Sequence, residues 1–115
     1  MTAVAFNLDQ VQDAVNEAAM AARTAAKLAL QKYGDRDACG FAWVNVYKVR
    51  SNSKLGKALQ AAGFRKSYTG GLQLWNPSQA GVQSVGILEA GAEAYAEVLR
   101  TKLGLESCYA GSRLD

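Results

Sequence analysis

Residues 50 to 57 have the sequence RSNSKLGK, in which two lysines, an arginine, two serines and a glycine could form an anion-binding loop. The segment begins a predicted helix, where free backbone N–H groups and the helix dipole favour a negative charge. The candidate ligands of this phosphate cradle are Arg50, Ser53, Lys54 and Lys57. Because the Gly-x-x-x-x-Gly-Lys spacing of a P-loop is missing, the alternative is an ordinary capped helix with solvated lysines.

Aromatic and basic residues are interleaved in the stretch that follows. Arg65 and Lys66 precede Tyr68, and Trp75 follows a glycine-rich turn. Rings interleaved with cations on a strand suit base stacking combined with phosphate contact. Tyr47, on an earlier predicted strand, would add another stacking ring. The alternative is that these rings belong to the core and the cations lie at its rim, because sheets bury aromatic side chains on one face.

The carboxyl-terminal residues, YAGSRLD from position 109 to 115, place Arg113 beside a glycine and a serine. Exposed backbone donors next to that guanidinium would suit an anion. Arg113 is therefore a further candidate anion-binding residue. The alternative is a frayed terminus, which is the usual state of such a tail.

Charge is distributed unevenly along the chain. The net charge is +3, yet residues 38 to 88 contain no acid and carry six lysines and arginines. The flanking segments, 1 to 37 and 89 to 115, have net charges of −1 and −2. A block of one sign attracts partners of the opposite sign, so we expect the middle of the chain to be the working surface. The alternative is six solvated cations balanced by acidic helices.

The composition also excludes several kinds of chemistry. The chain has no histidine and only two cysteines, Cys39 and Cys108. Ser–His, Cys–His and Cys/His metal constellations are therefore excluded, and no paired carboxylates indicate acid–base catalysis. We name no catalytic residue, no metal ligand and no cofactor, and expect a protein that is not an enzyme. Few cysteines, no long apolar stretch and no recognisable secretory signal predict a cytoplasmic protein.

The elements that position these residues follow from apolar periodicity and capping. Residues 8 to 33 form a predicted amphipathic helix, which Asn7 and Gln10 begin with a capping box and Gly34 ends. Ten alanines in the first thirty residues would let this helix approach a neighbour closely, either in its own domain or in a second subunit. Alternation predicts a strand at 40 to 49 that carries Phe41, Trp43, Asn45 and Tyr47 on one face, and because both of its faces are largely apolar we expect a central strand.

The rest of the chain predicts a mixture of short strands and helices. These elements are a short helix at 51 to 62, a hairpin of strands 64 to 68 and 72 to 75, a helix at 87 to 103, and a short strand from 107 in a terminal tail. The order α-β-α-β-β-α-(β), without repeats or a linker, predicts one α+β domain over residues 1 to 115. Its small sheet would be antiparallel or mixed, with helices mostly on one face.

Several segments together resemble a known group of proteins. The segments are ACGFAWV at 38 to 44, KLGKAL at 54 to 59, GFRKSYTGG at 63 to 71, LWNPS at 74 to 78 and YAGSRLD at 109 to 115. They resemble a group of small proteins encoded by tailed bacteriophages and prophages, over roughly residues 38 to 115. The resemblance implies a small accessory role in the cytoplasm of a bacterial host, and it implies no activity, ligand or site residue.

Three functions agree with these observations. The first is a non-enzymatic module that binds a phosphate-bearing partner, either single-stranded nucleic acid or a nucleotide, through a basic, aromatic-lined surface. The alternative is a protein-interaction module or an inhibitor of a host protein that acts as a homo-oligomer, most simply a dimer. A small enzyme without histidine chemistry is the third.

Overall fold

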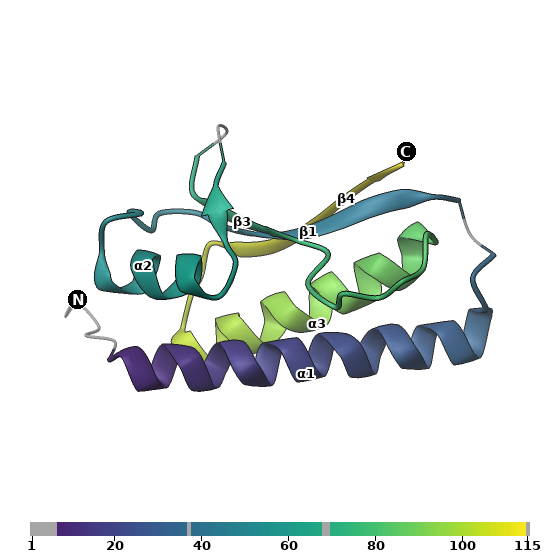
Figure 1. Cartoon of the computed structure of the whole chain (residues 1–115), viewed down its shortest axis with the longest axis horizontal. Coiled ribbons are helices and arrows are strands. Elements are labelled where there is room, and N and C mark those ends of the chain that lie inside the picture. Colours follow the sequence, from purple (N-terminus) through teal and green to yellow (C-terminus); the bar gives the residue numbers. More distant parts are fainter. Residues whose placement is uncertain (1–6, 37, 68–69, 115) are drawn as a thin grey trace.

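Helix α1 (Leu8–Tyr33) is the longest element and runs along one side of the molecule (Figure 1). The structure is a computed structural model that describes residues 7–36, 38–67 and 70–114. The predicted capping box is confirmed: Asn7 Oδ1 accepts from the Gln10 backbone N–H at 2.7 Å, and Gln10 Oε1 accepts from the Asn7 backbone N–H at 3.3 Å. Gly34, with a φ of 72°, ends the helix in a backbone conformation that glycine adopts without steric cost.

The inner face of α1 consists of small side chains. Its buried residues are Val11, Ala14, Ala18, Ala22 and Ala26. Helix α3 (Val85–Leu103) packs along this face, and short side chains let the two helix backbones approach closely. The alanine-rich helix was expected to pack closely against either its own domain or a second subunit. In the structure its close neighbour is α3, in the same domain.

The two later helices each follow a serine at the N-cap position, and the side chain of the first of these serines caps its helix. Ser53 Oγ accepts from the Gly56 backbone N–H at 3.0 Å and begins α2 (Lys54–Ala61). Ser84 precedes α3, and the Asp35 carboxylate accepts from both the backbone N–H and the hydroxyl of Ser84. This anchored start explains why α3 begins two residues before its predicted position. Within the described ranges, none of the helices combines the length and the apolar character that crossing a membrane requires.

Four antiparallel strands form the sheet. They are β1 (Gly40–Val46), β2 (Arg65–Lys66), β3 (Leu72–Trp75) and β4 (Cys108–Leu114), in the spatial order β2-β3-β1-β4. The predicted α+β class is confirmed, and β1 is central because it pairs with β3 on one side and β4 on the other.

Three strand boundaries differ from those predicted. β1 ends at Val46 instead of continuing to 49, because Lys48 has a φ of 62°, which a strand does not allow. The hairpin strand predicted at 64 to 68 is reduced to β2, and positions 68 and 69 lie outside the described residues. The predicted frayed tail is wrong. β4 pairs along the whole of β1, from Cys108 opposite Val46 to Leu114 opposite Gly40.

The sheet has one covered and one uncovered face. Both long helices and α2 lie on the same side of it (Figure 1). Alternation along β1 places Ala42, Val44 and Val46 on the helix side, where each is at most 1% exposed. The intervening residues of β1 therefore point to the opposite side. No described element covers that side (Figure 1), where Phe41 is exposed, Trp43 is half-buried and Asn45 is buried between its neighbours.

Candidate nucleic-acid interface

The uncovered face of the sheet carries its side chains in cross-strand rows. The register places Trp43 of β1 opposite Trp75 of β3 and opposite Gly111 of β4. Two residues earlier along β1, Phe41 lies opposite Arg113. Residues directly opposite one another in antiparallel strands point to the same face of the sheet. Three aromatic rings and a guanidinium are therefore presented together.

Three of these rings, Phe41, Trp43 and Trp75, form a contacting group that we call the aromatic cluster. The ring centroids of Trp43 and Trp75 are 4.9 Å apart, and those of Phe41 and Trp75 are 5.9 Å apart in an edge-to-face arrangement. Phe41 is 39% exposed and Trp75 is 48% exposed. Large apolar side chains gathered and exposed on one face of a protein mark an interaction site.

Gly111 allows the Trp43 indole to lie against the backbone of β4. A Cβ atom at position 111 would stand 2.5 Å from Trp43 Nε1 and 2.8 Å from Trp43 Cε2. Glycine inside a strand is unfavourable unless something approaches its backbone closely, and here the indole does so. The Trp43 ring therefore lies between the backbone of β4 and the Trp75 ring.

A polar row lies beside the aromatic cluster. It crosses all four strands as Arg65, Gln73, Asn45 and Tyr109. Gln73 Nε2 donates to Asn45 Oδ1 at 3.1 Å, and Trp75 Nε1 donates to Gln73 Oε1 at 2.7 Å. Asn45, only 9% exposed, thereby obtains the partner that a buried amide needs. Amides beside accessible rings are groups that can read the edges of unpaired bases.

A second pair of rings extends the face beyond the polar row. The ring centroids of Tyr47 and Tyr109 are 6.3 Å apart, and Tyr109 is 52% exposed. The Tyr47 backbone N–H donates to the Ser107 carbonyl at 2.8 Å, which holds this end of the face together. From Phe41 to Tyr47 the rings span about 20 Å, at the usual rise of a strand.

The electrostatic character of this face is positive. The described strands contain no aspartate or glutamate, whereas Arg65 and Arg113 lie at opposite corners of the face. The Arg113 guanidinium carbon is 5.7 Å from the Phe41 ring centroid, within the range of a cation–π contact. Neither arginine forms a salt bridge with a described residue. Both charges are therefore available to an anionic ligand.

The predicted phosphate cradle at 50 to 57 has a well-defined internal geometry. The Ser53 hydroxyl donates to the Arg50 carbonyl at 2.7 Å while it accepts from the Gly56 N–H. A Cβ atom at position 56 would collide with that same carbonyl oxygen, so glycine is required here by the close approach of the chain itself. This arrangement is that of a capped helix, and the side chains of Lys54 and Lys57 are exposed beside it.

The seven residues predicted to bind anions do not meet on one face. Lys57 and Lys66 line one shallow depression, and Arg65 and Lys66 line a neighbouring one at the β2 edge. Lys54 and Lys57 also line a hollow beside the start of α1. Arg113 is far from these residues, at the opposite end of the sheet. The edge formed by Lys57, Arg65 and Lys66 is therefore the main basic group.

The three predicted stacking residues have different surroundings. Trp75 belongs to the aromatic cluster, and Tyr47 lies partly buried beside Tyr109. Tyr68 lies outside the described residues. Phe41, Trp43 and Tyr109 were not predicted as stacking residues, although the alternation from 41 to 47 already placed the aromatic residues of β1 on one face. It offered no signal that this face is the uncovered one.

The side chains with shifted pKa values lie away from the uncovered face. The Ser84 hydroxyl lowers the pKa of Asp35 at the start of α3. Burial raises the pKa of the Cys108 thiol to about 11 and raises the pKa of the Tyr95 hydroxyl strongly, both on the helix side of the sheet. Among the residues that the structure describes, no three histidine, cysteine, aspartate or glutamate side chains could hold a metal ion.

Comparison with known proteins does not place the chain in a family. No family model, curated protein or solved structure matches it.

Proposed function

We propose that the chain is a non-enzymatic binding protein that holds single-stranded nucleic acid on the uncovered face of its sheet. The observation that carries this proposal is the exposure of the rings. Phe41, Trp75 and Tyr109 are between 39 and 52% exposed, although sheets normally bury aromatic side chains. Rings held in place by their neighbours and open to solvent provide stacking surfaces for unpaired bases.

The size of the face suits two or three bases. Base–aromatic stacking contributes about 1–3 kcal/mol per base. Sheet-based RNA-binding modules stack about two or three bases on the uncovered face of a four-stranded sheet with helices behind it, which is the same arrangement of layers as here. Gln73, which is half-buried, lies between the two groups of rings, where its amide can contact a base edge.

The positively charged side chains mark a path for a nucleic-acid strand across the face. Arg113 lies at one corner, and Arg65 with Lys66 and Lys57 lies at the β2 edge. Phosphates at both ends of a bound nucleic-acid strand would contact a cation, and the bases between them would stack on the aromatic rings. The strands carry no acid that would repel the phosphates.

The same exposed rings support a second function, a docking surface for another protein. Exposed apolar rings often mark protein interfaces. The positive charge makes self-association through this face unfavourable, because two copies would bring like charges together. A protein partner would need an acidic surface that covers Arg65 and Arg113.

The position of the tryptophans provides a direct test. The chain contains two tryptophans, Trp43 and Trp75, and both lie on the uncovered face. Single-stranded oligonucleotides of about ten residues should therefore quench the intrinsic fluorescence as they bind. Duplex DNA of the same length serves as the control and should bind more weakly, because its bases are already stacked.

Salt dependence separates phosphate contact from other binding. If Lys57, Lys66, Arg65 and Arg113 all contact phosphates, the logarithmic salt slope is about −2.8, and affinity falls about 50-fold from 50 to 200 mM salt. Absence of quenching at about 50 mM salt would refute the nucleic-acid proposal. Capture of an acidic host protein after nuclease treatment would then favour the docking function.

A further inference from the structure

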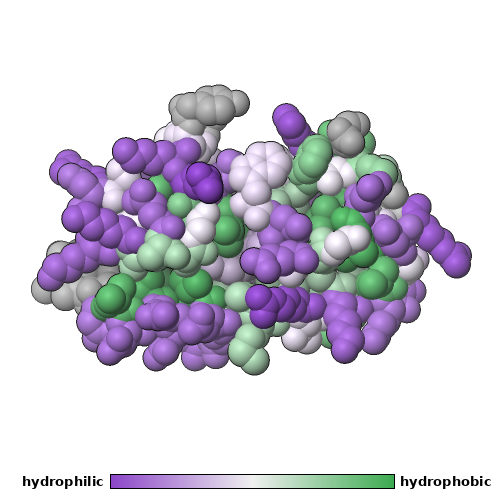
Figure 2. Space-filling view, viewed as in Figure 1, coloured by the Kyte–Doolittle hydropathy of each residue, from purple (hydrophilic) through white to green (hydrophobic). Residues whose placement is uncertain are grey.

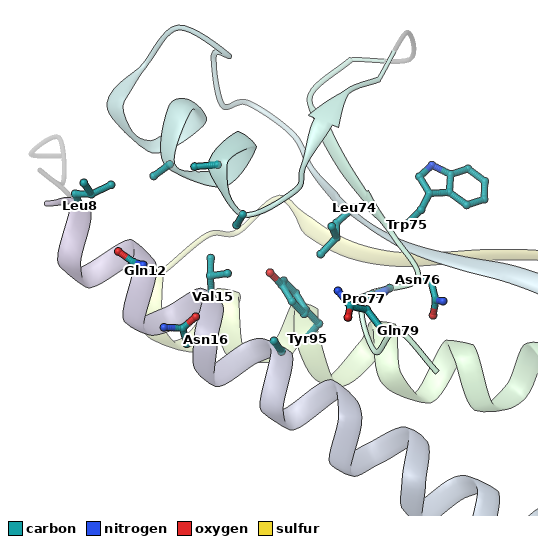
Figure 3. A pocket seen from close by; sticks show the side chains of 14 residues that line it. Leu8, Gln12, Val15, Asn16, Leu74, Trp75, Asn76, Pro77, Gln79 and Tyr95 are labelled. Atoms are coloured by element: carbon teal, nitrogen blue, oxygen red, sulfur yellow. The ribbon is translucent and has the colours of Figure 1, made fainter. Parts of the chain in front are cut away.

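A groove of about 440 Å³ lies on the helix side of the sheet, between α1, α2 and the turn that follows β3. Figure 3 shows Val15, Leu74 and Tyr95 directed toward one another across it, whereas the Trp75 ring points away. Hydrophobic side chains gather between α1 and α2, with hydrophilic side chains around them (Figure 2). The volume is in the range of pockets that hold small molecules. The groove and the uncovered face lie on opposite sides of the sheet, and Trp75 borders both.

The floor of the groove contains an unpartnered hydroxyl. Tyr95 is 2% exposed, and its Oη atom is buried without a hydrogen-bond partner among the described residues. Most buried hydroxyls in proteins are hydrogen-bonded, so one that lacks a partner and faces a groove indicates a missing ligand group. Burial also raises the pKa of this hydroxyl, which keeps it protonated and able to donate.

The rim of the groove consists of carboxamides. Gln12 and Asn16 come from α1, and Asn76 and Gln79 come from the turn after β3. Asn76 and Gln79 have φ values of 47° and 54°, a left-handed conformation that side-chain-bearing residues seldom adopt. Such strain is concentrated at ligand sites. Because each carboxamide both donates and accepts, the rim suits a ligand with both kinds of group.

The distribution of charge defines the rest of the ligand. None of the described residues that line the groove is charged. A second hollow continues along the same two helices, sharing Leu8, Ala58 and Ala61 with the groove, and it is lined by Lys54 and Lys57. The combined site therefore has an uncharged hydrogen-bonding end and a cationic end.

We infer that this groove binds a small molecule with an uncharged, hydrogen-bonding heterocycle at one end and an anionic group at the other, the chemistry of a nucleoside monophosphate. The heterocycle lies over Tyr95 between the carboxamides, and the phosphate lies between Lys54 and Lys57. A fatty acid would satisfy the two lysines but leave the tyrosine hydroxyl unpartnered. The inference goes beyond the proposed nucleic-acid interface and does not depend on it, although Lys57 lies at the edge of both sites.

Calorimetric titration with the four ribonucleoside 5′-monophosphates tests this inference. At least one should bind and raise the melting temperature, and the matching nucleoside should bind about tenfold more weakly, because it lacks the charge-assisted contacts to the lysines. Decanoate serves as the fatty-acid probe. Binding of decanoate without binding of any monophosphate, or no binding of any monophosphate up to ~1 mM, overturns the inference.

Variants localise the binding. Tyr95→Phe removes only the hydroxyl and should weaken the monophosphate about tenfold, while the melting temperature of the free protein stays the same or rises because no hydrogen bond is lost. Tyr33→Phe is the matched control, since Tyr33 is 66% exposed on α1, and it should change neither property. The double substitution Lys54→Ala and Lys57→Ala should weaken the monophosphate but not the nucleoside.

A last pair of measurements separates this site from the uncovered face. Tyr109→Ala should leave monophosphate binding unchanged and weaken oligonucleotide binding. Tyr95→Phe should have the reverse effect. Monophosphate binding that responds to Tyr109→Ala and not to Tyr95→Phe overturns the inference, because the nucleotide would then stack on the sheet. Failure of oligonucleotide binding alone overturns only the proposed function.

Discussion

Replacing Trp75 with alanine isolates the stacking contribution of the aromatic cluster. The side chain is 48% exposed, contacts the rings of Trp43 and Phe41, and donates from Nε1 to Gln73. Loss of one stacking surface should cost about 1–3 kcal/mol of binding free energy. At 1.4 kcal/mol per tenfold, affinity for a single-stranded oligonucleotide should fall about 5-fold to 140-fold.

Trp75→Ala should lower the stability of the domain by less than the total free energy of unfolding. Two ring contacts contribute about 0.5–1.5 kcal/mol each beyond buried area, against a typical domain stability of about 5–15 kcal/mol. The variant should therefore melt a few degrees lower and remain folded at room temperature. Thermal denaturation measured by circular dichroism checks this before binding is compared.

Two matched variants complete the assay. Trp75→Phe retains a ring but loses the indole donor, so its affinity should lie between those of the wild type and the alanine variant. Met20→Ala removes a side chain of α1 that is 66% exposed and should bind like the wild type. Fluorescence anisotropy of a labelled oligonucleotide measures all four proteins alike. A folded Trp75→Ala protein with wild-type affinity would refute the stacking argument.

Three further predictions concern the framework that supports both sites. The folded-state pKa of Asp35 is lowered by its hydrogen bonds at the start of α3, so its contribution to stability is complete above the unfolded pKa near 3.8 and is lost as pH falls through the lower folded value. The stability difference between the wild type and Asp35→Asn, measured by urea denaturation, should therefore shrink below about pH 4. With a thiol reagent at pH 8, exposed Cys39 should react quickly. Cys108, buried and with its pKa raised to about 11, should react only after unfolding. Gly111→Ala should displace the Trp43 indole, because the added Cβ would lie 2.5 Å from Nε1, and the change should appear as a shifted fluorescence maximum and a lower melting temperature.

The helices of this protein could be predicted well from local sequence. A capping box at Asn7 and Gln10, a glycine stop at position 34 and the recurrence of apolar residues along the chain depend only on neighbours three or four residues apart. The α+β class followed from the order of these elements. The start of α3 could not be placed correctly, because it depends on a carboxylate at position 35, which is distant in the sequence.

The candidate site was only partly predictable. Trp75, Arg65 and Arg113 were named from the sequence and lie on the uncovered face. The grouping of Arg50 with Lys54 and Lys57 followed from their adjacency in the chain. In the structure Lys54 and Lys57 line a hollow beside α1, and Lys57 also lies beside Lys66 at the β2 edge. Whether the chain forms a homo-oligomer stays a prediction.

The sequence by itself determined the periodicities, the absence of histidine and the acid-free middle of the chain, because these are properties of composition and of short-range spacing. Alternation also determined that the aromatic residues of β1 share one face. Only the tertiary structure decided that this face is open, because α3 packs on the opposite face of the sheet and α1 packs on α3 (Figure 1). It also decided that the last residues form β4, since strand pairing is a contact between distant segments that no local pattern encodes.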